Sequence, residues 1–253
     1  MPVPILMYHA IGEPRSLLSI TPADFTWQMN WLYKNNFQVL SLAEVVGYLQ
    51  QRKTLPARSV TITFDDGFEG VYRHAFPVLA RYGFSATVFL VAGYCGQVNN
   101  WPNQPASIPI LKLSGWSQVY EMDRFGIEFG SHSLSHPRLD HLPAIDVERE
   151  INSSKRIIEE HLCHSIDFFA FPYGQYNRLV QTFVRQTYSG ACTTSLGLAS
   201  KRNNPFEMPR IDIYYLREPS LFRLLSNPIL SVYLSQRRKL RAAASMILRR
   251  AWR

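Results

Sequence analysis

Val60-Thr61-Ile62-Thr63-Phe64-Asp65-Asp66-Gly67 is the most informative segment of this chain. Its first five residues are β-branched or apolar, which predicts a buried strand over residues 60–64. Side chains on an extended chain alternate between two sides, so Asp65 and Asp66 reach one site only if they lie in the turn that leaves the strand. Gly67 suits such a turn because it tolerates backbone angles that other residues resist.

A second polar motif, Ser131-His132-Ser133-Leu134-Ser135-His136-Pro137, follows further along the chain. One aspartate with His132 and His136 supplies three oxygen and nitrogen donors, the ligand count of a zinc-type catalytic site that leaves a position for water. The other aspartate is placed to act as a general base, because it can accept a proton from water as that water attacks a carbonyl. The two motifs together predict a metal-dependent hydrolase.

The composition fits one α/β domain of substantial size. The chain has 253 residues, of which 46% are hydrophobic and 13% aromatic, enough to bury a large core. Cys95, Cys163 and Cys192 have no CxxC spacing and leave an odd cysteine over, so neither a zinc-thiolate cluster nor a disulfide framework is predicted. No segment has the length and apolarity of a membrane span, and the N-terminus lacks the features of a secretory signal. We therefore expect a cytoplasmic enzyme.

The formal net charge of +8 is concentrated in residues 229–253, which hold seven Lys and Arg residues and no acid. A nucleic-acid-binding domain would spread its basic residues over a folded face, so this distribution argues against one. The helical spacing of basic and apolar residues predicts an amphipathic helix able to lie on an anionic membrane surface. A terminal helix docked on the domain with a solvated basic face fits the same pattern. The apolar side comprises Tyr233, Leu240, Ala244, Ile247 and Ala251.

Strand and helix signals alternate along most of the chain, which is typical of a parallel-sheet α/β architecture. Thr21 before Pro22 predicts a capped helix start, and apolar residues recur at helical spacing behind it. Strands are expected at residues 4–8, 37–40, 60–64, 85–91, 126–130, 168–171, 190–194 and 209–213. Helices are expected from residue 22 and over residues 42–51, 68–81, 114–125, 145–161 and 179–186.

Polar residues follow four of the expected strands. In parallel α/β barrels, the loops at the carboxyl ends of the strands converge on one face, where catalytic groups collect. Residues 93–109 are too long for an ordinary connection and are expected to form a loop beside the substrate. The groups expected to meet are His9, Asp65 with Asp66, His132 with His136, and Tyr173.

Thr63-Phe64-Asp65-Asp66-Gly67 and His132-Ser133-Leu134-Ser135-His136-Pro137 resemble, in order and spacing, the first two motifs of the polysaccharide deacetylases that share the NodB homology domain, carbohydrate esterase family 4. The similarity extends over roughly residues 3–213. Pro4-Ile5-Leu6-Met7-Tyr8-His9 and Phe171-Pro172-Tyr173-Gly174 are more similar to the branch of biofilm poly-N-acetylglucosamine deacetylases. The resemblance implies a distorted (β/α) barrel of about seven parallel strands, fewer than the usual eight. We expect this domain over residues 1–228 and a basic amphipathic helix over residues 229–253.

The resemblance also implies the chemistry. Members of the family hydrolyse N-acetyl, or sometimes O-acetyl, groups on sugars with the help of a divalent metal ion, for which we expect zinc. Carried over to the matching positions, Asp65 is the base, and the backbone N–H of Tyr173 helps to hold the oxyanion. The metal ligands are then Asp66, His132 and His136.

The chain departs from the family pattern at two places. The arginine that opens the third motif is replaced by Phe168-Phe169-Ala170-Phe171, and the histidine that usually serves as general acid is absent after residue 164. The biofilm branch resembles a circularly rearranged version of the family in which an N-terminal Met-Tyr-His supplies that proton, so His9 is the expected acid. Arg210 is expected to replace the missing arginine as the partner of Asp65.

Aromatic residues offer two candidates for stacking on sugar rings. Trp101 and Trp116 both have faces suited to that contact, and core packing is the alternative for each. The other histidines are expected to be structural or solvent-facing, namely His74, His141, His161 and His164.

Three functions are compatible with the sequence. The first is a metal-dependent deacetylase of an N-acetylated sugar or polysaccharide, acting on a lipid-linked or nascent polymer at the inner membrane face. The second is a hydrolase of another amide, such as a formamide or a cyclic ureide. The third is a non-catalytic glycan-binding subunit that keeps the barrel but not the chemistry, although the intact carboxylates and histidines argue against it.

Overall fold

The structure is a computed structural model of the chain. It describes residues 2–13, 15–16, 18–51, 55–102, 104–105 and 107–251, and the side chains among them except those of residues 51 and 244–251. Parts of two predicted segments lie outside the described residues, namely residues 103 and 106 of the loop 93–109 and residues 252 and 253 of the C-terminal helix. The side chains of Ala244, Ile247 and Ala251 also lie outside the description.

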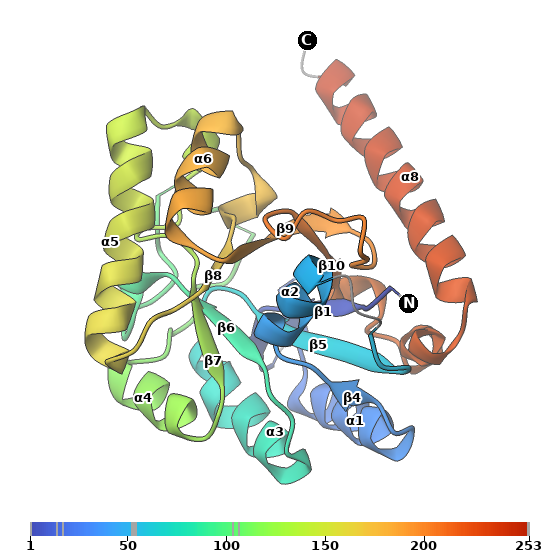
Figure 1. The fold of residues 1–253 in the computed structure, drawn as a ribbon. Coiled ribbons are helices and arrows are strands. Elements are labelled where there is room, and N and C mark those ends of the chain that lie inside the picture. Colours follow the sequence, from blue (N-terminus) through green and yellow to red (C-terminus); the bar gives the residue numbers. More distant parts are fainter. Residues whose placement is uncertain are drawn as a thin grey trace.

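Within the described residues, seven parallel strands close into a barrel, as the family resemblance predicted (Figure 1). Closure is made by β1, which pairs with β10 on one side and with β5 on the other. The register places Tyr8 beside Phe64 and Leu6 beside Ile211. The barrel strands are β1 (Ile5–Tyr8), β5 (Ser59–Phe64), β6 (Thr87–Leu90), β7 (Glu128–Ser131), β8 (Phe168–Ala170), β9 (Gly190–Leu196) and β10 (Met208–Asp212).

In the described part of the chain, three short strands lie outside the ring. The two-residue strand β4 (Gln38–Val39) pairs with the outer edge of β5. A separate parallel pair, β2 (Ala10–Ile11) and β3 (Ser19–Ile20), follows directly after β1. This pair shapes the chain just beyond His9, at the carboxyl end of the barrel.

Helices surround the barrel, and side-chain caps begin two of them, one at the predicted residue Thr21. The Thr21 hydroxyl accepts a hydrogen bond from Asp24 N at 3.0 Å. Ser41 and Glu44 cap each other reciprocally, through Glu44 N to Ser41 Oγ at 3.1 Å and Ser41 N to Glu44 Oε2 at 2.8 Å, an arrangement that satisfies the free amides of a first turn. The helices are α1 (Pro22–Lys34), α2 (Leu42–Gln51), α3 (Phe76–Tyr82), α4 (Trp116–Arg124), α5 (Ala144–Leu162), α6 (Arg178–Thr187), α7 (Pro219–Phe222) and α8 (Ile229–Ala251).

The segment 68–81 differs from the single helix predicted for it. Phe68 instead makes a β-bridge with Leu113. A π-helical stretch, Val71–Ala75, then precedes α3. Pro77 lies in the first turn of α3, and because proline has no N–H, an α-helix can begin there but cannot run through it undisturbed. Sequence analysis also missed the short helical turns between residues 213 and 226.

Alternation along β5 divides the core into two parts. Val60, Ile62 and Phe64 pack outward against the surrounding helices in the main hydrophobic cluster. Thr61 and Thr63 therefore face the interior of the barrel. A second cluster fills the amino end of that interior, where side chains of α2 pack against β1, β8 and β10. The barrel is thus closed by apolar packing at its amino end, and its polar groups collect toward the carboxyl end.

Candidate active site

The first part of the site is the turn that leaves β5. Asp65 N donates to Tyr8 O at 2.9 Å, which continues the pairing of β5 with β1 for one more residue. The chain then turns through two residues of positive φ, Asp66 at 69° and Gly67 at 74°. This turn allows both carboxylates to reach one end of the barrel, as their spacing predicted. The strain of a left-handed aspartate is of the kind that collects at functional sites.

The second part is the loop after β7 that carries both histidines. Ser133 and His136 also have positive φ, at 70° and 57°. Two hydroxyls support the loop from within, because Ser133 Oγ accepts from His136 N at 2.9 Å and Ser131 Oγ accepts from Ser133 N at 3.2 Å. The His132 ring is oriented by a 2.7 Å contact between its Nδ1 and Ala170 O, the partner that metal-binding histidines commonly have.

A buried glutamate on α5 holds the same loop from outside. Glu150 is 4% exposed. Its Oε2 accepts from Leu134 N at 3.0 Å and from Ser135 N at 2.9 Å, and its Oε1 accepts from Ser135 Oγ at 2.6 Å. Hydrogen bonds to a carboxylate are stronger than hydrogen bonds between neutral groups. Glu150 therefore holds the loop that carries both histidines against α5. This role of Glu150 was not predicted, although a glutamate in line with Val147, Ile151 and Ser154 is conspicuous on an otherwise buried helix face.

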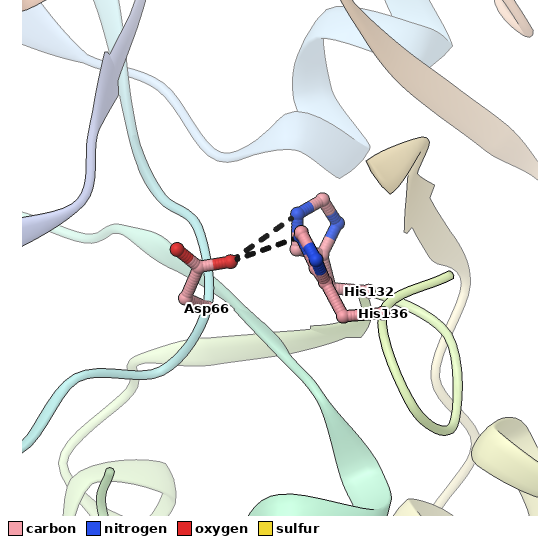
Figure 2. Close-up of side chains that lie close together, drawn as sticks. All are labelled: Asp66, His132 and His136. Atoms are coloured by element: carbon pink, nitrogen blue, oxygen red, sulfur yellow. Dashed lines mark ion pairs between the residues drawn. The ribbon is translucent and has the colours of Figure 1, made fainter. Parts of the chain in front are cut away.

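Asp66, His132 and His136 converge as predicted. Figure 2 shows the Asp66 carboxylate facing both imidazole rings. Asp66 Oδ1 lies 3.5 Å from His132 Nε2 and 3.4 Å from His136 Nε2, and the three ligand atoms lie within 4.8 Å of one another. Ligands bound about 2.1 Å from a tetrahedral zinc ion lie about 3.4 Å apart. The arrangement therefore fits a divalent metal ion.

The electrostatics of these three residues also fit a cation. Burial, followed by the charge of His132, lowers the pKa of His136 well below its ordinary value, so its imidazole is neutral and able to act as a ligand. Burial raises the pKa of Asp66, against the opposing influence of His9 and His132. Asp66 Oδ1 is buried and accepts no hydrogen bond among the described residues. A positive charge between these groups would compensate this carboxylate.

Asp65 has a different partner from its neighbour. Both of its oxygens accept from Arg210, with Nη1 to Oδ1 and Nη2 to Oδ2 both at 2.7 Å. Burial by itself would raise the pKa of Asp65, but the charge of Arg210, followed by that of His132, outweighs it and holds the pKa below its ordinary range. The contact expected between Arg210 and Asp65 is therefore present, and it keeps Asp65 ionised.

Arg210 is 1% exposed and reaches Asp65 through the interior of the barrel. Its Nε donates to Thr193 O at 3.0 Å and its Nη1 to Thr63 Oγ1 at 3.2 Å. The guanidinium also lies over the Phe89 ring, 5.6 Å from the centroid. These contacts restrict the orientation of the Arg210 guanidinium. The guanidinium in turn fixes the orientation of the Asp65 carboxylate.

A pocket of about 200 Å³ joins these groups to the remaining predicted residues. His9 lies beside Asp65, with Nε2 4.0 Å from Oδ2, and its side chain is 16% exposed. Tyr173 follows β8 with a φ of 58° and packs its ring on His136 at a centroid distance of 4.6 Å. The pocket is lined by His9, Leu18, Asp65, Asp66, Trp101, Gln104, Pro105, Ile108, His132, His136, Phe171, Tyr173 and Thr194.

The two candidate tryptophans have different positions. Trp101 is 4% exposed, lines the pocket and lies 4.4 Å from His136 between ring centroids. It is delivered by the loop 93–109, whose described residues Gln104, Pro105 and Ile108 also line the pocket. Trp116 is not brought to the pocket, because it opens α4 and stacks on His161 of α5 at 3.9 Å. For Trp116 the structure favours the packing alternative, since its ring contacts His161 between two helices and does not line the pocket.

The family model for polysaccharide deacetylases matches residues 52–188, more than half of the chain. The chain belongs to the polysaccharide deacetylase family. It is 30% identical over 212 residues to the YxkH protein of Bacillus subtilis, covering 83% of this chain and 71% of that protein. The Streptococcus pyogenes deacetylase PplD, solved in complex with acetate, has 28% sequence identity and a TM-score of 0.74, with 84% of this chain and 92% of that chain covered.

A more distant similarity connects this polysaccharide deacetylase family member to enzymes with a named substrate. The poly-β-1,6-N-acetyl-D-glucosamine N-deacetylase of Staphylococcus aureus is 27% identical over 165 residues, covering 63% of this chain. The aligned part is 55% of the staphylococcal protein, so the chain spans little more than half of its length.

Proposed function

We propose that this protein is a metal-dependent deacetylase that hydrolyses the N-acetyl group of an amino-sugar saccharide. The observation that carries the proposal is that two adjacent carboxylates have different contact partners. Asp66 faces His132 and His136, whereas Asp65 is held by Arg210 next to that group. A metal-binding carboxylate and a separate, ionised carboxylate are what metal-assisted amide hydrolysis requires.

Asp66, His132 and His136 would hold the divalent cation, for which zinc is our proposal because one carboxylate and two imidazoles form a common catalytic zinc ligand set. When bound, the cation would polarise the acetyl carbonyl and make water more acidic. The remaining steps belong to side chains and backbone of the chain itself.

Asp65 is the general base in this account. It takes a proton from the water whose oxygen attacks the acetyl carbon, and Arg210 keeps it ionised and correctly turned for that step. The backbone N–H of Tyr173 donates to the oxygen that becomes negative in the tetrahedral intermediate. A donor of this kind lowers the barrier by about 3 kcal/mol.

His9 is the general acid. As the carbon–nitrogen bond breaks, the leaving nitrogen needs a proton, because an amine anion is a very poor leaving group near neutral pH. His9 Nε2 lies 4.0 Å from Asp65 Oδ2, on the more exposed side of the pocket, where the sugar nitrogen would arrive. The products are acetate and the free amino sugar. Acetate is also the molecule bound to the similar deacetylase PplD.

The substrate class follows from the relatives and from the pocket. The staphylococcal relatives act on β-1,6-linked N-acetylglucosamine by name, and we propose a saccharide of the same class here. A pocket of about 200 Å³ has room for one acetamido group and the water that attacks it. Trp101 lies at its wall and is the residue proposed to contact the sugar ring.

The test uses the full chain, stripped by a chelator and reloaded with one equivalent of zinc. We expect it to release acetate and to form free amines in equal amounts from β-1,6-linked N-acetylglucosamine oligomers. A parallel panel of formamides and cyclic ureides should yield no product. Formate release from formamides or ring opening of cyclic ureides, without acetate from the oligomers, would replace the proposal by hydrolysis of another amide. No turnover of either panel, with zinc bound, would favour a glycan-binding role.

A further inference from the structure

The C-terminal helix α8 has one docked face and one face without a partner. Leu230 and Leu234 are 4% and 3% exposed and pack into the main hydrophobic cluster, and Tyr233 donates from its hydroxyl to Tyr215 O at 2.8 Å. From residue 236 to residue 243, every side chain is exposed. Figure 1 shows the later part of α8 projecting clear of the barrel. The apolar anchoring of the helix is therefore confined to its first turns.

The exposed face of α8 carries an apolar stripe. Ile229, Val232 and Leu240 are 57%, 55% and 61% exposed. At 3.6 residues per turn these three side chains fall within an arc of about 80°, centred about 140° from the docked Leu230 and Leu234. The stripe thus points away from the barrel, on the side of the helix that no described element covers.

Basic side chains flank this stripe. Lys239 and Arg237 lie on either side of it by the same helical geometry, and the last 25 residues of the chain contain seven Lys and Arg residues and no acid. No side chain of α8 that the structure describes forms an ion pair with a carboxylate. Arg237 lies over the Tyr233 ring, 5.2 Å from its centroid, a contact that leaves its charge without a counter-ion. An apolar stripe between unpaired cations is the pattern of helices that lie in the interface of an anionic bilayer. A soluble polyanion would be attracted by the cations but would not bury the apolar stripe.

The position of α8 relates this surface to the pocket. Its first turn borders a cavity at the amino end of the barrel, together with Pro4 and Ser59. Further along the helix, Arg241 Nη1 donates to Thr194 O at 3.1 Å, and Thr194 lines the pocket that holds Asp65 and Asp66. The ten residues after Arg241 continue for about 15 Å at 1.5 Å per residue. The helix therefore passes the pocket wall and extends beyond it.

We propose that α8 binds the surface of an anionic phospholipid bilayer and holds the catalytic pocket beside it. The helix would lie in the interface rather than cross it, and in the part of the chain that the structure describes no helix is long and apolar enough for a span. With the stripe against the lipid, the pocket wall at Thr194 lies on the other side of a helix about 10–12 Å thick. This inference rests on the proposed function. The geometry favours, as the substrate, an N-acetylated saccharide that is attached to a lipid or lies on the membrane surface.

The test is flotation of the full chain with vesicles of equal parts zwitterionic and anionic phospholipid, and with purely zwitterionic vesicles. We expect binding to the anionic vesicles only. Leu240→Asp should weaken that binding by about tenfold, because it puts a charge in the stripe that the lipid would bury. Ile145→Asp is the matched control, since Ile145 is 71% exposed on α5 and the substitution changes the net charge equally. It should leave vesicle binding unchanged.

Three results would overturn the proposal: no binding to anionic vesicles, equal weakening by Leu240→Asp and Ile145→Asp, or binding to soluble acidic polysaccharide in preference to vesicles. The two latter results would identify a partner recognised by charge alone. Acetate release from soluble oligosaccharides is measured alongside and should be the same for both variants. Vesicle binding without any acetate release would contradict the proposed deacetylase activity while leaving the membrane surface of α8 in place.

Discussion

Two cavities lie at opposite ends of the barrel, and they differ in both size and chemistry. The cavity at the amino end, about 470 Å³, is lined largely by prolines and apolar side chains, among them Pro4, Pro56 and Leu198, with Arg58 as its charged residue. The pocket at the carboxyl end is about 200 Å³ and holds two aspartates and three histidines. Volume alone would therefore have indicated the wrong end of the molecule.

Residues with positive φ occur at both ends, but only those at the carboxyl end carry or support the polar groups of the pocket. Of the seven described non-glycine residues with positive φ, Asp66, Ser133, His136 and Tyr173 lie at the carboxyl end, whereas Asn36, Arg58 and Cys163 lie in the connections that precede β4, β5 and β8. At the amino end, apolar packing of α2 closes the barrel. Strained residues persist only where surrounding contacts hold them, and the contacts that hold the histidine loop come from Glu150, Ser131 and Ser133. The carboxyl end is thus built for reactivity and the amino end for stability, and each prediction below tests this difference.

The largest effect is expected for Asp65→Asn. Asparagine keeps the shape of the side chain but cannot accept the proton from water, so the rate of acetate release should fall by roughly a thousandfold or more. Initial rates at saturating oligosaccharide measure the loss. A variant with nearly full activity would remove Asp65 from the role of base.

Arg210→Gln should lower the free energy of unfolding by about 3–5 kcal/mol, because it leaves a buried carboxylate without its partner. In the native protein Asp65 has a lowered pKa, so the pair stabilises the fold above the carboxyl's ordinary pKa, and this contribution is lost as the pH falls through the lowered value. In the variant, burial acts unopposed by that charge and raises the pKa of Asp65.

The gap in stability between the native protein and Arg210→Gln should therefore narrow as the pH is lowered, since Asp65 of the variant then takes up a proton. Urea denaturation at several pH values between neutrality and mild acid measures the gap. Arg58→Gln at the amino end is the matched control, and it should change the stability by less than about 0.5 kcal/mol. A gap that widens on acidification would contradict the assignment of the buried pair.

His9→Gln should slow amide hydrolysis by about a hundredfold, since the leaving nitrogen loses its proton donor. Hydrolysis of 4-nitrophenyl acetate by the same variant should change far less, because nitrophenolate leaves without a proton. Equal losses on the amide and on the ester would point to a role for His9 other than that of general acid.

Glu150→Gln should weaken zinc binding by about tenfold. The amide offers one acceptor oxygen where the carboxylate now accepts three hydrogen bonds, so the loop that carries both histidines is held less firmly. Calorimetric zinc titration measures the affinity, and Glu148→Gln on the exposed face of the same helix is the control. The unfolding temperature of the metal-free protein separates loss of positioning from general loss of stability, and unchanged zinc affinity would leave Glu150 with a structural role alone.

The smallest effect is expected at the amino end. Ala57→Leu adds apolar volume to the wall of the larger cavity and should leave acetate release and zinc affinity within about twofold of the native values, as surface substitutions usually do. A strong loss of activity would show that this cavity takes part in the reaction and would break the contrast between the two ends.

Sequence reasoning could identify the carboxyl end because its chemistry is local. Asp65 with Asp66, and His132 with His136, each occupy one short turn after a strand, and parallel strands bring such turns together. The seven-strand barrel came from the family resemblance, since strand periodicity gives no count of barrel strands. The expected contact of Arg210 with Asp65 had the same origin, because nothing in the residues near Arg210 indicates its partner.

Features that depend on packing between distant segments could not be predicted. The contact of Glu150 with the histidine loop requires the placement of α5, and the position of Trp116 depends on how α4 meets that same helix. On α8, the amphipathic pattern indicated a helix but not its docked side. Leu230 and Leu234 anchor it, while Leu240, one of the apolar residues noted from the sequence, is exposed.

The assignment of different tasks to two neighbouring aspartates is tested most directly by calorimetric titration of zinc into Asp65→Asn and Asp66→Asn. The account predicts that Asp65→Asn binds one zinc ion per chain about as tightly as the native protein. Asp66→Asn should lose affinity by about a hundredfold or more, as removal of a ligand exceeds the effect of its supporting partners. Equal loss of zinc binding in both variants, or tight zinc binding in both, would contradict the assignment of different tasks to Asp65 and Asp66.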